Sequence, residues 1–171
     1  MTITIEQLKS LAEREGLTYF VAPDRPALLA NFGGLTGSYQ VIILVELDGR
    51  FLQLRTLGYG KCPADHPHVD AVLRVLGALD YKYRLTKFGW DPSDGEIVGY
   101  ADLWLEDATL TQGQFAGMLH ALIPAIDQGH ARIARTIETG VDPDGSTVPG
   151  TGTSTGTGSP DPSTTPDLTT V

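Results

Sequence analysis

The sequence is poor in cysteine, in basic side chains and in long apolar runs. Cys62 is the single cysteine among 171 residues, which excludes an intramolecular disulfide and is typical of a reducing compartment. Twelve Lys and Arg face 21 Asp and Glu, giving a formal charge of −9, so a nucleic acid partner is not expected. Neither a signal peptide at the start nor the roughly 18 apolar residues of a membrane helix can be recognised. These absences predict a soluble, cytoplasmic protein with no membrane partner.

Residues 141–171 differ in composition from the rest of the chain. Thr, Ser, Gly and Pro supply 23 of these 31 residues, and four Asp occur there without any Lys or Arg. Such a segment cannot bury enough apolar surface to offset the entropy of the chain. We therefore expect one folded domain over residues 1–140, followed by a disordered acidic tail.

Apolar spacing within the first 140 residues predicts three helices. The expected helices cover residues 5–15, 67–80 and 111–137. Thr4 with Gln7, and Thr111 with Gln114, match the capping-box pattern at the start of the first and last of them. Both helices should therefore begin at these threonines.

Alternating apolar residues and turn signals predict six strands. The expected strands cover residues 17–21, 27–32, 39–47, 50–59, 82–90 and 96–105. Asp48-Gly49 predicts a two-residue turn in the first hairpin, and residues 91–95 form the turn of the second. Hairpins without βαβ units predict an α+β fold, with helices packed mainly on one face of an antiparallel sheet.

Residues 57–135 carry the layout of a known family. They contain VLRVLGALDY before a strand, an Asp-Pro turn ending in DGE, a strand ending in LED, and TLTQGQF opening the last helix. In these features the segment resembles the YbjN family of bacterial sensory-transduction regulators. The resemblance implies a fold similar to type III secretion chaperones: a small domain, often a homodimer, that handles other proteins and has no established enzymatic activity. It implies no catalytic residue.

The second predicted hairpin carries the candidate binding face. Both tryptophans of the chain fall here, and Phe88, Trp90, Val98, Tyr100 and Trp104 are expected to share the face directed away from the core. Helices gathered on one side of the sheet would leave this face uncovered. It is then a partner-binding or dimer face, while the alternative is aromatic packing that stabilises the sheet itself.

A second hypothesis is a metal-responsive or thiol-dependent regulatory module centred on Cys62, His66 and His68. A closed zinc site needs four ligands, and the cluster is one ligand short. The simpler interpretation is that Asp65 caps a helix and both histidines lie solvated in its first turn. We therefore expect no metal and no cofactor.

A third hypothesis is hydrolysis by clustered carboxylates. These are Asp91, Asp94 and Glu96 in the second hairpin, and Glu106 and Asp107 after it. Aspartates in turns usually bond the local backbone, which favours a solvated role. The leading prediction follows the resemblance to the YbjN family: a non-enzymatic homodimer that binds a segment of a partner protein, as a chaperone or regulatory adaptor, through apolar burial and strand addition at a sheet edge.

Overall fold

The computed structural model describes residues 2–105 and 108–145. The helices are α1 (Ile5–Arg14), α2 (Val69–Lys82) and α3 (Gln112–Thr139). The strands are β1 (Tyr19–Val21), β2 (Ala27–Gly33), β3 (Ser38–Glu46), β4 (Phe51–Leu57), β5 (Gly60–Lys61), β6 (Lys87–Trp90) and β7 (Glu96–Trp104). Among the described residues, no helix is long and apolar enough to cross a membrane.

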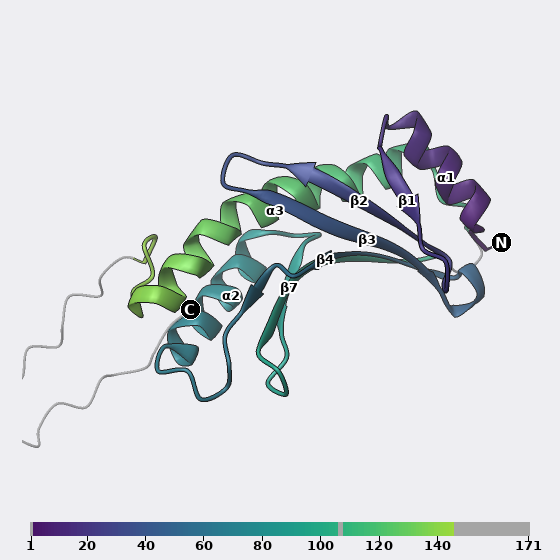
Figure 1. Ribbon diagram of the computed structural model, residues 1–171. Helices are drawn as coiled ribbons and strands as arrows, with labels where there is room; N and C mark the ends of the chain where they lie inside the picture. The colour runs from purple at the N-terminus through teal and green to yellow at the C-terminus, as the bar shows by residue number, and fades with distance from the viewer. Residues whose placement is uncertain (1, 106–107, 146–171) are drawn as a thin grey trace, which may run out of the picture.

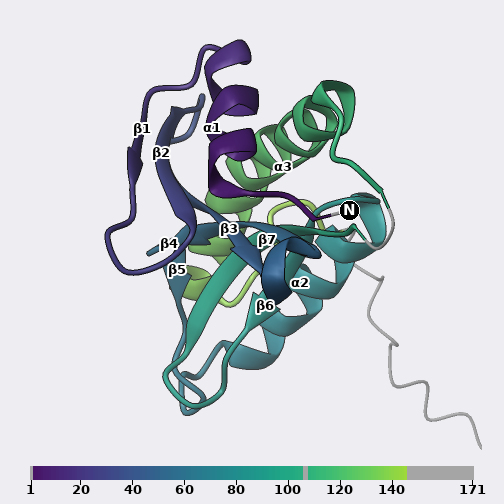
Figure 2. The ribbon, with the colours of Figure 1, turned by 90° about the vertical axis from the view of Figure 1, so that its right-hand side faces the viewer.

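All strand pairs of the sheet run antiparallel. β1, β2, β3, β4 and β7 follow one another across it, and β7 also pairs with β5 and β6. Figures 1 and 2 show α2 and α3 side by side, with α1 near the beginning of α3. Buried residues of all three helices join alternate residues of the strands in one core. The predicted α+β fold, with its helices on one face of the sheet, is confirmed.

The core face of the sheet is closely packed against α3. Val41, Ile43, Leu54 and Ile97 are fully buried there. Gly99 lets the helix approach β7, because a Cβ at this position would lie 2.5 Å from Cγ2 of Ile126. Gly99 therefore allows β7 and α3 to pack closely at this point.

The predicted capping boxes are present in the structure. The Thr4 hydroxyl accepts a hydrogen bond from the backbone N–H of Gln7, whose side chain accepts one from the N–H of Thr4. Thr111 and Gln114 repeat this arrangement at α3. Sequence therefore located both helix starts correctly.

The turn of the first hairpin differs from the prediction. Glu46 pairs with Phe51, so four residues rather than two connect the strands. Leu47, Asp48 and Gly49 all have positive φ. The backbone N–H of Ile3 donates to the Gly49 carbonyl over 2.8 Å, and this contact holds the N-terminal segment against the turn.

The described chain extends five residues beyond 140. There the Arg132 guanidinium donates from Nε and Nη2 to the two carboxylate oxygens of Asp142, over 2.8 and 2.7 Å. These bonds hold the segment that follows α3 against the helix. The rest of the expected tail, residues 146–171, lies outside the described residues.

Candidate functional site

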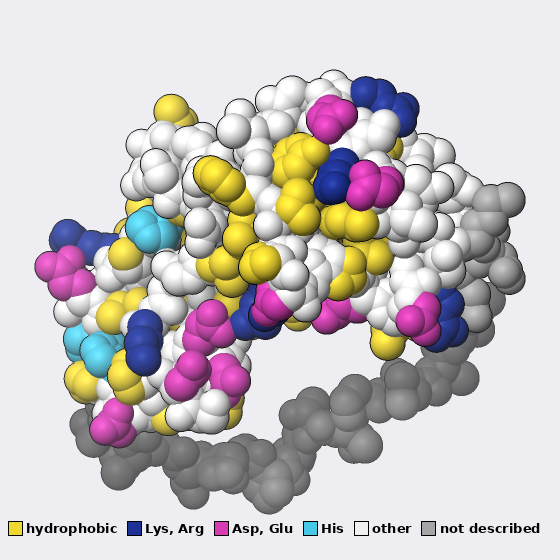
Figure 3. All heavy atoms as spheres, turned by 45° about the vertical axis from the view of Figure 1, so that its right-hand side comes forward, with side chains coloured by type: hydrophobic (Ala, Val, Ile, Leu, Met, Phe, Trp, Pro, Cys, Tyr) yellow, Lys and Arg dark blue, Asp and Glu magenta, His cyan; other side chains and the backbone are white. Residues whose placement is uncertain are grey.

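One face of the sheet carries apolar side chains but no helix from the described residues. The strand register directs Leu29, Ile42 and Leu44 to this face, which we call the open face. These residues belong to a second apolar cluster, separate from the core: Ala22, Ala27, Leu29, Ile42, Leu44 and Leu57. Every member lies in a strand or beside one. Figure 3 shows hydrophobic side chains gathered across one view of the surface, bordered by acidic and basic groups.

The open face continues onto β4 and β7 with aromatic side chains. Trp104 lies opposite Phe51 in the register, with ring centroids 6.1 Å apart, and half of its surface is exposed. Tyr100 and Val98 follow on the same face of β7 and are half-buried. This part of the predicted binding face is therefore directed away from the helices, as expected.

A polar hollow of about 600 Å³ lies between these strands and the tip of the second hairpin. Within it the Arg55 guanidinium donates to Glu96 over 2.6 Å, and the Gln53 amide donates to Asp102 over 2.8 Å. Asp91 also borders the hollow. The charged lining of the hollow is therefore mainly acidic, and its one arginine is already paired.

The prediction that five hairpin residues share one face is wrong for Phe88 and Trp90. Phe88 lies opposite Gly99, and Trp90 lies opposite Ile97, which places both on the core face. Phe88 is only 5% exposed. The Trp90 indole N–H donates to the Cys62 carbonyl over 2.7 Å, although Trp90 also borders the polar hollow.

The length of the connecting turn causes this error. The N–H of Asp91 donates to the Glu96 carbonyl, and the N–H of Gly95 donates to the Asp91 carbonyl. Gly95 has a φ of +79°, a conformation that favours glycine. The resulting register displaces β6 along β7 by one residue from the expected pairing. Side chains of β6 that were expected on the open face therefore lie on the core face.

The three residues of the metal or thiol hypothesis do not form a ligand set. The Cys62 side chain is fully buried, and burial raises the pKa of its thiol. Nδ1 of His66 accepts from the His68 N–H, while Nδ1 of His68 lies 2.8 Å from the Ile137 carbonyl oxygen. Within residues 2–105 and 108–145, no three His, Cys, Asp or Glu side chains converge on a possible metal position.

Two of the three candidate carboxylates in the second hairpin bond their own turn. Asp91 accepts from the Ser93 N–H over 2.8 Å, and Asp94 accepts from the Glu96 N–H over 2.9 Å. Hydrogen bonds from Ser93 hold the pKa of Asp91 below its usual value. Glu106 and Asp107, the other two candidates, lie outside the described residues. Asp91 and Asp94 thus stabilise the turn, whereas Glu96 pairs with Arg55.

Sequence reasoning missed the role of Asp127, a buried acid on α3. Its carboxylate accepts from the N–H groups of Leu35 and Thr36, each over 2.8 Å, and from the Tyr39 hydroxyl over 2.9 Å. Backbone hydrogen bonds from Thr36 and Leu35 lower its pKa to about 2. Asp127 therefore fixes the β2–β3 loop on α3. An acid within the apolar stripe of the helix was the only sequence signal.

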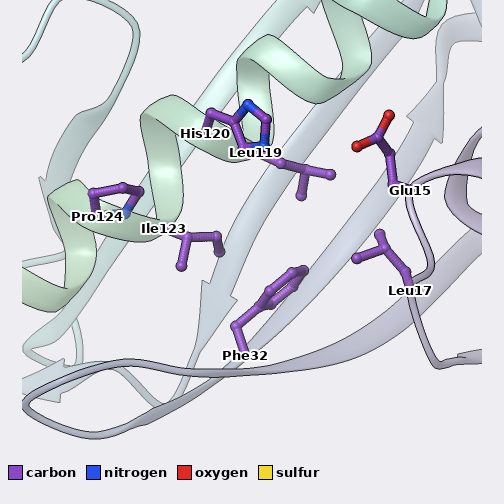
Figure 4. Close-up of a pocket in the computed structure, with 7 residues that line it drawn as sticks. All are labelled: Glu15, Leu17, Phe32, Leu119, His120, Ile123 and Pro124. Carbon is purple, nitrogen blue, oxygen red and sulfur yellow. The ribbon is translucent and has the colours of Figure 1, made fainter.

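A groove between α1, β2 and α3 was also missed. It has a volume of about 480 Å³ and is lined by Glu15, Leu17, Phe32, Leu119, His120, Ile123 and Pro124. Figure 4 shows these side chains around a common opening, with Glu15 and His120 near its rim. The lining comes from three separate segments of the chain. No local motif could have predicted it.

Two solved structures of low sequence identity share this architecture, and a third has a lower TM-score. The crystal structure of YbjN from E. coli is similar with a TM-score of 0.57 and 15% identity, over 79% of this chain and 95% of that one. The ExsC–ExsE complex has a similar chain with a TM-score of 0.51 and 19% identity, over 78% and 97% of the two chains. A chain of the HopA1–SchA chaperone–effector complex gives a TM-score of 0.47 and 13% identity, over 72% and 90%. No curated protein matches in sequence.

The family itself is given by a sequence match. Residues 4–134 match the family model of YbjN, described as "Putative bacterial sensory transduction regulator". The match covers both predicted hairpins, the open face of the sheet and most of α3. Because it spans well over half of the sequence, the chain belongs to the YbjN family.

Proposed function

We propose that this protein is a non-enzymatic protein-binding module that holds a segment of a partner protein on the open face of its sheet. Such a module acts either like a chaperone or as a regulatory adaptor. The observation that carries the proposal is the second apolar cluster, which no helix of the described residues covers. In a single copy of the chain, the edges of this cluster remain in contact with water.

Exposure along the open face supports binding by apolar burial. Phe20 is 69% exposed and lies opposite Leu29, at the β1 side of the face. Trp104 is half exposed at the β7 side. Covering apolar surface contributes about 25 cal/mol per Å², and large aromatic residues commonly dominate the free energy of binding at protein interfaces.

The edges of the sheet offer the second contribution to binding. β1 pairs only with β2, and β6 pairs only with β7, among the described residues. An extended partner segment that crosses the open face can add to either edge through main-chain hydrogen bonds. The acidic hollow favours basic over acidic side chains in that segment.

A homodimer and a cytoplasmic location belong to the same proposal. A homodimer needs a self-complementary contact surface, and the YbjN resemblance led us to expect one. Sedimentation velocity of the purified protein measures the oligomeric state directly, independently of any partner.

Affinity purification with matched variants tests the proposed partner face. Trp104→Ser and Leu44→Ser remove apolar side chains from the open face. Leu35→Ser removes a leucine that is 99% exposed in the β2–β3 loop and serves as the control. We expect the first two variants to retain at least about tenfold less of a specific partner, on the scale of a binding hot spot, and the control to retain it fully.

Thermal melts of the same variants separate lost binding from lost folding. Each variant should stay folded at the temperature of the purification. Equal partner retention by all three folded variants would contradict the open face as the binding surface.

A further inference from the structure

We propose that the groove between α1, β2 and α3 is a second binding site, which receives one hydrophobic side chain of a peptide together with a neighbouring Arg or Lys. The groove lies on the helix side of the sheet, whereas the open face lies on the other. The inference therefore does not depend on the function proposed above.

The walls of the groove are largely apolar. Leu17 and Phe32 contribute from the sheet side, and Leu119, Ile123 and Pro124 contribute from α3. Its volume of about 480 Å³ lies within the range of roughly 300 to 1,000 Å³ that is typical of ligand pockets. The groove is therefore large enough for one leucine or phenylalanine side chain and part of its backbone.

The polar groups of the groove favour a cation. Glu15 is the C-cap residue of α1, where the helix dipole already places partial negative charge. Its carboxylate accepts from the neutral amide of Gln112 and forms no ion pair within the described residues. A bound cation would offset the repulsion between this carboxylate and the C-terminal end of the helix dipole.

The neighbouring arginine of the chain does not supply that cation. Arg14 donates to the carbonyl and hydroxyl of Ser10 instead. His120 is the one other ionisable residue in the lining, and it forms no ion pair with Glu15 in the described chain.

Pro124 removes one backbone hydrogen bond from α3 beside the groove. Proline has no N–H, so the carbonyl of His120, four residues earlier in α3, lacks the donor of the usual helical bond. Both residues line the groove. In the proposed complex, a peptide N–H or a guanidinium donates to this carbonyl while the hydrophobic side chain fills the apolar part. The apolar walls and the Glu15 carboxylate together favour a Phe-Arg or Leu-Lys type of sequence.

Titration of the ¹⁵N-labelled full-length protein with two dipeptides tests the proposal. The probes are N-acetyl-Phe-Arg amide and N-acetyl-Phe-Glu amide, which differ only in charge and side chain at one position. We expect the Arg probe to shift the amide signals of Leu17, Phe32 and Ile123 at millimolar concentration. The Glu probe should bind at least about threefold more weakly, the scale of a partly exposed ion pair.

Charge variants provide the matched control. Glu15→Gln should reduce the preference for the Arg probe to near one. Glu6→Gln removes the same charge from an exposed position of the same helix and should leave the preference unchanged. Equal binding of both probes, or shifts that cluster outside the groove, would overturn the proposal.

Two measurements on the protein without added peptide test for other occupants of the groove. Nuclear Overhauser contacts between groove side chains and residues 146–171 would show that the chain fills its own groove. Dilution-dependent shifts of the groove amides would show that a second copy fills it. Either result also overturns the proposal, whereas their absence together with preferential binding of the Arg probe supports it.

Discussion

Two glycines on opposite faces of the second hairpin test which side of the sheet the helices cover. Gly99 faces α3, and a Cβ there would lie 2.5 Å from Cγ2 of the fully buried Ile126. Gly89 faces the open side, where a Cβ would lie 3.3 Å from Val98 and 3.4 Å from Tyr100. Neither glycine has positive φ, so alanine is compatible with the backbone at both positions.

The expected costs follow from these distances. Carbon atoms pack best at about 3.5 to 4.0 Å, so Gly99→Ala forces an overlap of about 1 Å in a close-packed interior. Overpacking of this kind costs about 1 to 3 kcal/mol of unfolding free energy. At Gly89 the neighbouring side chains need to move by only a few tenths of an ångström at a surface. That substitution should change stability by no more than about 0.5 kcal/mol.

Urea denaturation followed by circular dichroism measures the difference. With a denaturant slope of about 2 kcal/mol per molar, Gly99→Ala should lower the urea midpoint by roughly 1 M, and Gly89→Ala should leave it nearly unchanged. Similar losses from both substitutions would refute the reasoning, because they would show a second packed layer over the open face.

Three further predictions concern other parts of the molecule. The lowered pKa of Asp127 means that its carboxylate contributes stability above about pH 4, and that this contribution is lost as the pH falls towards 2. The melting temperature of Asp127→Asn should therefore lack the part of the pH dependence that comes from this carboxylate. A chain ending at Gly145 should melt within about 2 °C of the full chain. A chain ending at Gly140 should lose about 1 to 3 kcal/mol of unfolding free energy, because Arg132, with only 12% of its side chain exposed, loses its carboxylate partner. Equal melting of the two truncated chains would contradict this role of Asp142. Chelation by EDTA should leave the melting temperature unchanged, and Cys62→Ser should lower it, because a hydroxyl would replace a buried thiol; stoichiometric zinc in the purified protein would revive the metal hypothesis.

Local signals in the sequence predicted the fold well. The reciprocal capping residues located the starts of α1 and α3, since a cap depends on residues only three positions apart. Alternating apolar residues likewise located β4 and β7. The helices gathered on one face followed from the presence of hairpins in place of βαβ units.

The features that were predicted wrongly or missed depend on contacts between distant parts of the chain. Phe88 and Trp90 were assigned to the wrong face because periodicity determines the faces of one strand, while the turn geometry determines how two strands align. The groove at Glu15 and Pro124 depends on the packing of segments more than a hundred residues apart. Val98, Tyr100 and Trp104 could be placed correctly because their alternation with buried residues is contained within one strand.

Photo-crosslinking from the open face tests the central claim most directly. The variants Leu44→p-benzoylphenylalanine and Trp104→p-benzoylphenylalanine carry a crosslinker on the open face, and Leu35→p-benzoylphenylalanine carries it in the β2–β3 loop. Irradiation of cells that naturally make the protein should crosslink the first two variants to one defined segment of a partner protein, and leave the third without that product. Crosslinking of the same product from all three positions, or from Leu35 alone, would contradict a partner-binding role for the open face.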